Sequence, residues 1–297
     1  MKSLLKWVGG KTQLLDTLFE NFPKEINNYH EIFIGGGSVL ISLLSDTDII
    51  IKGTINAYDA NEILIYMYKN IQSSPNEILN NILPLIAEYQ TCNNTNDDIN
   101  RVPKDKNEAK ICKENYYYWI RKIYNSLSDQ DKRNPIGSAL FIFLNKTCFR
   151  GLYRVGPNGF NVPYGHYNNP EIINKDHLYN IHNLIKNVNF ECCDFSHSLS
   201  KNFQKDDFIY LDPPYAPESS TSFVSYTENG FNIEHHNKLF NIIKSLNVKC
   251  IMSNSYVPLV VDNFNTADYT ILSVVVKRSI NSKKPNAKTK EVIIKNY

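Results

Sequence analysis

The stretch "IYLDPPYAP" (209–217) holds the residues best suited to do chemistry. An apolar segment ends in Asp212, and Pro213, Pro214 and Tyr215 follow. The prolines remove two backbone donors and stiffen the turn, so the Asp212 carboxylate and the Pro213 carbonyl face a ligand as acceptors. Two acceptors beside the flat ring of Tyr215 suit a planar ring that carries an amino group. A rigid surface turn is the alternative.

Two glycine clusters precede this stretch. In "LKWVGGKTQLL" (4–14), the GGKT is similar to the end of a phosphate-binding loop, but Leu5 stands where that loop has its first glycine, and we expect no strand before it. We therefore do not expect a nucleotide triphosphatase. The second cluster, "FIGGGS" (33–38), lacks the G-x-G-x-x-G spacing of dinucleotide sites.

Asp59 ends the apolar segment that follows the second cluster, where a carboxylate is well placed for the hydroxyls of a ribose. Glycines at one strand end and an acid at the next indicate a ligand that contains a nucleoside. An ordinary turn with a helix-capping Asp is the alternative.

Hydrophobic patterns place these residues at the ends of strands. The segments 29–38 and 54–70 each predict a strand, a turn and the start of a helix. The alternation resumes with strands within 188–195, 207–215 and 248–254, a helix near 234–246, and strands at 268–277 and 290–295. Such alternation is typical of a parallel sheet, which binds ligands at the carboxyl ends of its strands.

A different pattern interrupts this alternation. Residues 63–145 predict helices, and a basic stretch rich in turns follows at 150–170. We predict an α/β domain built from residues 1–62 and 174–297, with a mainly helical domain inserted at 63–173.

Composition excludes several classes of protein. With 297 residues and 42% hydrophobic side chains, the chain can fill a real core. No apolar run approaches the roughly 20 residues of a membrane span, and the start is too short in apolar residues for a signal peptide. The six cysteines form no C-x-x-C pair, so neither a zinc site nor a disulfide framework is expected. His235 and His236 are adjacent and are expected on a solvated helix start, so no metal is predicted.

The net charge of +2 is unevenly distributed. Residues 132–170 hold five Lys or Arg and no acid, and residues 271–297 hold seven against the single acid Glu291. These stretches indicate a cationic surface for a polyanion. A solvated basic face is the alternative.

Taken in order, the motifs resemble the Dam family of DNA adenine (N6) methyltransferases. The resemblance covers nearly the whole chain. It rests on "KWVGGK" (6–11), "FIGGGS" (33–38), "DANEIL" (59–64), "NKTCFRGLYRV" (145–155), "FNVPYGHY" (160–167), "DF" (194–195), "DPPYAPESSTSFVSYTENGF" (212–231) and "KRSIN…KEVIIKN" (277–296). It implies a Rossmann-like fold that binds S-adenosylmethionine, with an inserted recognition domain that carries a β-hairpin.

The resemblance also implies a set of cofactor contacts. The GGK segment would lie over the methionine end, the glycine turn near the amino-acid moiety, Asp59 on the ribose and Asp194 with Phe195 beside the adenine. The full set is Trp7, Lys11, Phe33, Gly35, Gly36, Gly37, Asp59, Asp194, Phe195 and Asp212. Because the cofactor is a sulfonium without a phosphate, glycine loops would occur without a phosphate-binding loop.

The implied reaction is direct methyl transfer to adenine N6, with Asp212, Pro213, Pro214 and Tyr215 as the catalytic residues. The base would be flipped out of the duplex and stacked on Tyr215. Residues 216–230 are rich in Ser and Thr, and we predict that they form a lid that orders on DNA.

The expected DNA contacts come from the start of the chain and the basic 145–167 region. Phe149 would wedge into the stack, and Arg154 would bind a guanine edge. Arg150 and His166 depart from the family, which often has Asn and Arg there, so the stringency of GATC recognition is open. The full set is Lys6, Phe149, Arg150, Leu152, Arg154, Pro163 and His166.

Several alternatives stay open at this point. A cytosine-N4 methyltransferase needs the same acceptors, another adenine methyltransferase would read a different short target, and a DNA-binding module would lack activity. We expect double-stranded DNA as the partner, a monomer that acts in the cytoplasm, the nucleoid or a viral replication site, and no membrane. A cognate restriction endonuclease would be a further partner in restriction-modification.

Overall fold

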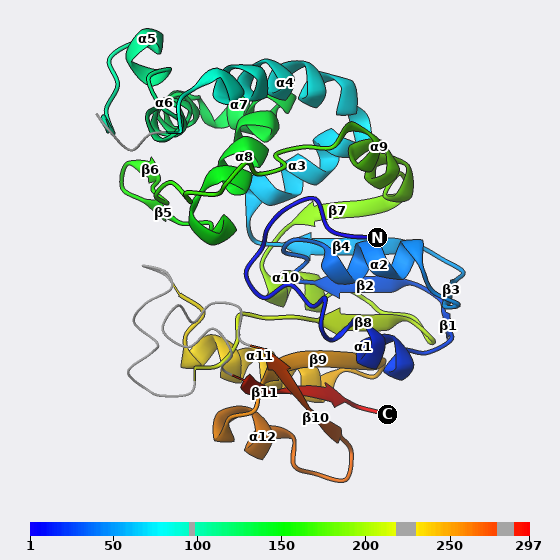
Figure 1. Ribbon diagram of the computed structural model, residues 1–297. Coiled ribbons are helices and arrows are strands. Elements are labelled where there is room, and N and C mark those ends of the chain that lie inside the picture. Colours follow the sequence, from blue (N-terminus) through cyan, green and yellow to red (C-terminus); the bar gives the residue numbers. More distant parts are fainter. Residues whose placement is uncertain (95–98, 218–229, 278–287) are drawn as a thin grey trace. The chain divides into compact units, whose positions relative to one another are not determined.

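The computed structural model describes residues 1–94, 99–217, 230–277 and 288–297. The chain forms two compact units (Figure 1). One contains residues 1–10, 35–41 and 61–186, and the other contains residues 11–34, 42–60 and 187–297. The first is mainly helical and the second holds a large sheet, so the protein is α/β, as the sequence predicted. The functional boundaries at residues 62 and 174 stay a prediction.

The sheet unit is organised around seven strands (Figure 1). Four of them are mutually parallel: β7 (Val188–Cys192), β4 (Ile55–Asp59), β2 (Tyr29–Ile32) and β8 (Phe208–Leu211). The strand β9 (Lys249–Ser255) continues the parallel set, and β11 (Lys288–Lys295) and β10 (Thr270–Lys277) run antiparallel to their neighbours. The order is β10-β11-β9-β8-β2-β4-β7, and β1 (Glu25–Ile26) pairs with β3 (Ile50–Ile51) in a separate ladder.

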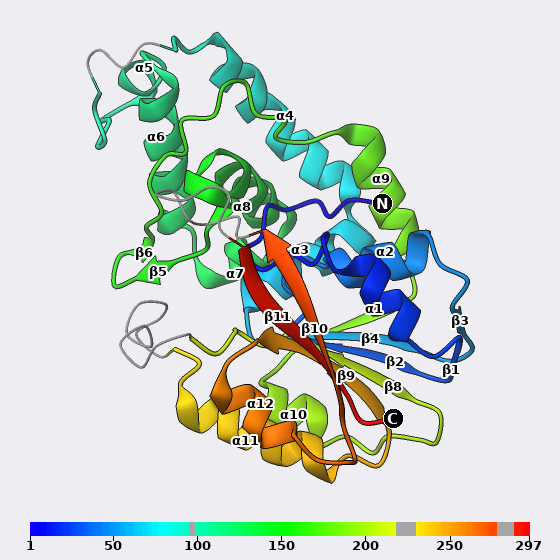
Figure 2. The ribbon, with the colours of Figure 1, turned by 60° about the horizontal axis from the view of Figure 1, so that its bottom comes forward.

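The central strands are short and apolar because both faces of the sheet are covered. Every residue of β2 and β8 is buried. On one face, Ile209 and Leu211 pack in a core with residues of α10 (Phe195–Leu199), α11 (Ile233–Ser245) and α12 (Pro258–Phe264). Figure 2 shows these three helices below the sheet. On the other face, Phe22 after α1 (Leu15–Asn21) contacts the rings of Phe208 and Tyr210.

Strand β8 ends earlier than the predicted span of 207–215. Its last residue is Leu211, because Pro213 and Pro214 cannot donate to a ladder. The first residue beyond it, Asp212, still donates its backbone N–H to the Ile32 carbonyl at 3.3 Å. The turn at residues 212–215 therefore starts at the carboxyl edge of the sheet, as predicted.

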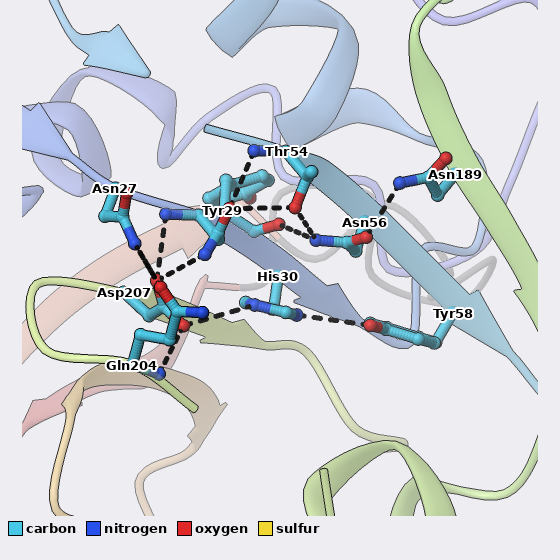
Figure 3. A network of polar contacts seen from close by, with 10 residues as sticks. Asn27, Tyr29, His30, Thr54, Asn56, Tyr58, Asn189, Gln204 and Asp207 are labelled. Carbon is cyan, nitrogen blue, oxygen red and sulfur yellow. Dashed lines mark hydrogen bonds and ion pairs between the residues drawn. The ribbon is translucent and has the colours of Figure 1, made fainter. Parts of the chain in front are cut away.

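A polar network occupies the opposite, amino-terminal end of the same strands (Figure 3). Asp207 lies directly before β8 and is 2% exposed. Its Oδ1 accepts from Asn27 Nδ2, Asn28 N and Asn28 Nδ2 at 2.8–3.0 Å, and its Oδ2 accepts from Gln204 N at 2.7 Å. The network fastens the 204–207 turn to the start of β2.

The helical unit contains α3 (Glu62–Ser73), α4 (Pro75–Thr91), α5 (Lys106–Ala109), α6 (Lys113–Ser126), α7 (Asp129–Arg133), α8 (Pro135–Thr147) and α9 (Lys175–Leu184). Helix α2 (Ser38–Ser45) is divided between the units after residue 41. The apolar α8 is buried along most of its length and packs against α3, α4 and α6. It ends at Thr147, and a 3-10 turn, Phe149–Gly151, leads into the hairpin of β5 (Val155–Gly156) and β6 (Gly159–Phe160). The predicted β-hairpin is therefore present.

Candidate active site

Asp212 forms an ion pair with Lys11. Lys11 Nζ lies 2.7 Å from Asp212 Oδ2, and the two side chains are 4% and 19% exposed. The other oxygen, Oδ1, is buried and accepts no hydrogen bond within the described part of the chain. A buried acceptor without a partner costs free energy, so this oxygen is suited to take an N–H from a ligand.

Burial is the main influence on the Asp212 carboxyl and raises its pKa to about 6. Lys11 lowers the pKa and the nearby Glu291 raises it. A carboxylate with a raised pKa is a stronger hydrogen-bond acceptor than an exposed one. The Asp212 carboxylate is therefore more stable when a ligand donates a hydrogen bond to it than when it is ionised without that bond.

The Tyr215 ring is held in place through its hydroxyl. Its hydroxyl donates to Glu291 Oε2 at 2.7 Å, and Lys11 Nζ lies 4.7 Å from the ring centroid. Burial raises the phenol pKa well above its usual range, so the hydroxyl stays a neutral donor. The ring is anchored to β11 before any ligand binds.

Asn254 holds the chain that leaves the turn. It is fully buried at the end of β9, and its Oδ1 accepts from Ala216 N at 3.0 Å and from Ser255 N at 2.8 Å. Its Nδ2 is buried and has no acceptor among the described residues. The turn from Asp212 to Ala216 is thus secured at both ends by neighbouring strands.

An aromatic cavity of about 220 Å³ lies beside the turn, at the carboxyl ends of β2, β4 and β7. Phe33 and Phe195 stack with ring centroids 5.8 Å apart, and Phe231 meets both rings at 5.4–5.8 Å. Phe33 has a φ of 69°, a backbone conformation that is strained for a bulky residue and is found most often at functional sites. The cavity is lined by Ile32, Phe33, Tyr58, Asp59, Ala60, Cys193, Asp194, Phe195, Ser198, Pro214 and Phe231.

Two carboxylates stand in the wall of this cavity. Asp59 is the last residue of β4, and its carbonyl accepts from Cys193 N at 3.1 Å. Asp194 is the N-cap of α10 and accepts from Ser196 N at 2.8 Å. Burial raises the Asp194 pKa, but the Ser196 hydrogen bonds outweigh burial and leave it below its usual value. The structure therefore brings Phe33, Asp59, Asp194 and Phe195 together.

In the helical unit, the glycine turn packs against Trp7. A Cβ on Gly36 would lie 2.6 Å from Trp7 Cβ, and a Cβ on Gly35 would lie 2.9 Å from the indole Nε1. Gly37 has a φ of 68°, and the Tyr68 hydroxyl donates to the Gly35 carbonyl at 3.0 Å. The close approach of Trp7 thus requires glycine at positions 35 and 36, and the close approach of Tyr68 requires it at 37.

The predicted DNA contacts of the helical unit start from Lys6. Its backbone is clamped by Asn145, which accepts from Lys6 N at 2.9 Å and donates to Lys6 O at 2.8 Å. Its Nζ lies 3.4 Å from the centroid of the Tyr167 ring and donates to the Lys146 carbonyl. Partial burial lowers the Lys6 pKa. Lys6 is therefore joined to both ends of the 145–167 region.

Phe149 and Arg150 lie on a tight turn of that region. Phe149 is 42% exposed, and its N–H donates to the Pro163 carbonyl at 2.8 Å. Arg150 has a φ of 58° and its guanidinium lies 5.2 Å from the Phe149 ring. Leu152, partly buried, follows, and Pro163 is exposed. An exposed aromatic ring beside a cation suits contact with bases and phosphates.

Arg154 and His166 have protein partners. Arg154 is exposed beside the hairpin and donates to Asn161 Oδ1 at 2.6 Å and Asn161 O at 3.1 Å. These bonds hold the guanidinium in one orientation. His166 Nε2 lies 3.6 Å from the carboxylate of the buried Glu114. All seven predicted DNA contacts belong to the helical unit.

The prediction for the paired histidines is half wrong. His235 caps the start of α11 together with Asn232, as a solvated helix start requires. His236 is instead fully buried against Phe231 and Phe240, and burial lowers its pKa to about 4. It points inward because the next helical position faces the core.

The predictions about a lid, a metal and a membrane span can be compared only with the residues that the structure describes. Of the predicted lid at 216–230, residues 218–229 lie outside them. Within the described ranges, no group of three His, Cys, Asp or Glu side chains could hold a metal ion. No helix there is both long and apolar enough to cross a bilayer.

Sequence reasoning missed three residues of the site. Phe231 completes the aromatic cavity, Asn254 secures the turn, and Glu291 bonds Tyr215. One signal was available for Glu291, because it is the single acid among seven cations in residues 271–297. Asn254 had a weaker signal as a polar residue at the end of an apolar strand.

Comparisons with known proteins agree with this geometry. Residues 7–280 match the family model described as D12 class N6 adenine-specific DNA methyltransferase. The chain is 37% identical to the type II methyltransferase M.MjaIII of Methanocaldococcus jannaschii, over 100% of this chain and 99% of that protein. It is 32% identical to the type II methyltransferase M1.LlaDCHI of Lactococcus lactis subsp. cremoris, over 100% and 96%.

More distant likenesses follow. The DNA adenine methylase of Escherichia coli K12 is 29% identical over 95% of this chain and 90% of its own. An O-methyltransferase from Bacillus cereus, solved in complex with SAH, aligns with 97% of this chain and 80% of its own at 10% identity and a TM-score of 0.34. That structural likeness is too weak to support an argument.

Proposed function

The chain belongs to the D12 class N6 adenine-specific DNA methyltransferases, and from this premise we propose that it methylates adenine N6 at GATC in duplex DNA. The protein is an adenine-specific DNA methyltransferase that uses S-adenosylmethionine. The observation that carries the mechanism is Asp212, with one oxygen on Lys11 and the other buried without a partner among the described residues.

The aromatic cavity fits the adenosine part of the cofactor. Three phenylalanine rings offer stacking faces, and two carboxylates in the wall, Asp59 and Asp194, offer acceptors for hydroxyl and amino groups. We assign Asp59 to the ribose, Asp194 with Phe195 to the adenine, and Trp7, Lys11 and Gly35–Gly37 to the methionine end. When bound, S-adenosylmethionine supplies an electrophilic methyl group on sulfonium.

The residues of the catalytic turn prepare the target amine. The lone pair of an adenine N6 is delocalised into the ring, which makes it a poor nucleophile. Asp212 Oδ1 and the Pro213 carbonyl accept its two N–H bonds and favour a pyramidal nitrogen whose lone pair is free to attack. Positioning of this kind supplies much of a rate enhancement. Asp212 Oδ1 is also the base beside the proton that the nitrogen loses.

Tyr215 receives the flipped base. A base inside a duplex is out of reach, and unstacking it costs a few kcal/mol. The Tyr215 ring offers a stacking platform, since Glu291 and Lys11 already hold it in place. In DNA recognition, Phe149 inserts into the gap and Arg154 reads a guanine edge.

GATC is the target that the DNA-contact residues support. Asn161 holds Arg154 in one orientation. The resemblance to the Dam family assigns Phe149, Leu152 and Pro163 to DNA contact. Arg150 and His166 are the departures, and His166 is drawn toward Glu114. We propose that Arg150 contacts a phosphate and that recognition is less stringent at the position of His166.

The test uses purified protein, methyl-labelled S-adenosylmethionine and two duplexes, one with GATC and one with those four bases scrambled. We expect label on GATC alone and none with Asp212→Ala. Label on both duplexes would refute GATC specificity. Digestion to nucleosides must yield N6-methyladenine; N4-methylcytosine would replace the proposal with the sister activity.

The biological setting is proposed on the same basis. We propose action as a monomer on DNA in the cytoplasm, the nucleoid or a viral replication site, since one strand is modified per event. Two relatives are named type II methyltransferases, which supports a cognate restriction endonuclease as a partner. A nuclease that cuts unmethylated GATC, encoded beside this chain, is the finding to look for.

A further inference from the structure

We propose that Glu291 is a positioning residue for methyl transfer, which holds the plane of the Tyr215 ring and keeps Asp212 a strong acceptor. The inference rests on the proposed function, because it assigns Tyr215 to the flipped base and Asp212 to its amine. Nothing in the reaction itself requires a carboxylate at this position.

The first argument is where Glu291 comes from. It belongs to β11, paired opposite Ser255 of β9, and so lies within the sheet. Its Oε2 accepts from the Tyr215 hydroxyl at 2.7 Å, across 76 residues of sequence. A bond from a loop residue to a sheet residue transfers the rigidity of the sheet to the ring.

The second argument is what the bond adds. The backbone after Tyr215 is already tied by Asn254, which accepts from Ala216 N at 3.0 Å. A tyrosine side chain has two rotatable bonds, so fixing its backbone and its hydroxyl together determines the plane of the ring. A base that must stack on this face then meets a surface that needs no further ordering.

The third argument is charge. Lys11 pairs with Asp212 at 2.7 Å, and Glu291 is the second carboxylate near that pair. Lys11 stabilises the ionised form of Asp212, whereas Glu291 disfavours it. The titratable groups that face Asp212 are Lys11 before α1, Tyr210 of β8, Tyr215 of the turn and Glu291 of β11.

These groups make the two roles of Glu291 separable. Glu291→Gln keeps an oxygen that accepts from the Tyr215 hydroxyl but removes the negative charge. Glu291→Ala removes both. The two variants therefore separate the effect of positioning the Tyr215 ring from the effect of the Glu291 charge on Asp212.

A matched control lies in the same sheet. The Tyr210 hydroxyl and Ser253 Oγ are 2.9 Å apart and buried, so Ser253→Ala also deletes a polar partner of a buried tyrosine. The Ser253 hydroxyl bonds Tyr210, a residue to which we assign no contact with the base or the cofactor. The change in kcat of Ser253→Ala therefore measures the effect of disturbing β9 alone.

The experiment measures kcat, the KM for a GATC duplex and the dissociation constant for S-adenosylmethionine. We expect Glu291→Ala to lower kcat about 10- to 100-fold, the range for a hydrogen bond to a charged group, with cofactor affinity within about twofold of wild type. Glu291→Gln restores most of kcat. Tyr215→Phe combined with Glu291→Ala is no worse than the poorer single variant, because both delete one bond.

The pH profile supplies a readout that a purely structural role would not move. The acid limb of kcat follows Asp212, and Glu291→Gln should shift it to lower pH because a charge that raises the Asp212 pKa is gone. The base-flipping signal of 2-aminopurine at the target position should fall in Glu291→Ala and stay in Ser253→Ala.

Two results would overturn the inference while the proposed function stands. One is a wild-type kcat in Glu291→Ala with wild-type methylation of GATC. The other is an equal loss in Glu291→Ala, Glu291→Gln and Ser253→Ala with an unmoved acid limb, which would indicate general damage to the sheet. A wild-type protein that labels no DNA would instead refute the proposed function itself.

Discussion

Two aspartates flank the same strand, and their surroundings are opposite. Asp207 lies before β8 and Asp212 after it, and both are largely buried. Asp207 accepts four hydrogen bonds from Asn27, Asn28 and Gln204, which occupy both of its oxygens. In the part of the chain that the structure describes, Asp212 has one ion pair, with Lys11, and one oxygen without a hydrogen-bond partner.

The comparison separates a carboxylate whose hydrogen bonds are supplied by the fold from one that is suited to accept a bond from a ligand. The larger hollow, of about 390 Å³, lies at the amino ends near Asp207 and Asn28, whereas the cavity beside Asp212 is about 220 Å³. Size alone therefore favours the amino ends of the strands. The unmet hydrogen-bonding capacity of Asp212 favours the carboxyl ends, because a buried acceptor without a partner among the described residues costs free energy that a ligand can recover.

The largest expected effect is that of Asp212→Asn on methylation. The amide keeps the volume but replaces an anionic acceptor with a group that also donates. We expect kcat to fall about 10³-fold, as when one electrostatic group of an active site is removed, while the circular dichroism spectrum stays that of wild type. Retention of a tenth of the activity would contradict the role of Asp212.

Asp207→Ala tests the other half of the comparison. Four partly buried hydrogen bonds would lose their acceptor, so we expect a loss of about 3 kcal/mol in the free energy of unfolding, measured by urea denaturation. Activity per folded molecule should be unchanged. The neighbouring exposed Asp206, as Asp206→Asn, is the control and should unfold as wild type does.

Asp59→Ala tests whether the carboxyl ends of the strands bind the cofactor. Loss of a charged acceptor for the ribose should weaken S-adenosylmethionine binding about 10- to 100-fold by calorimetry. Asn56, three residues earlier on β4, lies at the amino end, and its side chain bonds Thr54 and the Tyr29 carbonyl. Asn56→Ala should leave cofactor affinity unaltered; equal losses in both variants would erase the distinction between the two ends.

The smallest effect is that of pH. The Asp212 pKa is raised to about 6, chiefly by burial, and only the ionised form accepts both the Lys11 bond and an N–H. Activity should therefore be full above pH 7 and fall about tenfold per pH unit below 6. Single-turnover rates across pH 5–8 measure this, and a flat profile would show that Asp212 does not titrate in that range.

Much of this arrangement was legible in the order of residues. Apolar runs that stop at Gly35, Asp59 and Asp212 predicted a parallel sheet with its ligands at the carboxyl edge, because strand ends share one edge. The helical insertion followed from periodicity, and the turn-rich stretch after it from its turn residues; the hairpin was implied by the resemblance. These features are local, so short windows of sequence contain the information.

Contacts between distant residues were decided only in three dimensions. Tyr215 and Glu291 are 76 residues apart, and Lys11 and Asp212 are about 200 apart. Neither spacing carries a signal, because such pairs form only when the strands take their order in the sheet. For the same reason the sequence could not show that His236 is buried or that Asp207 is saturated and Asp212 is not.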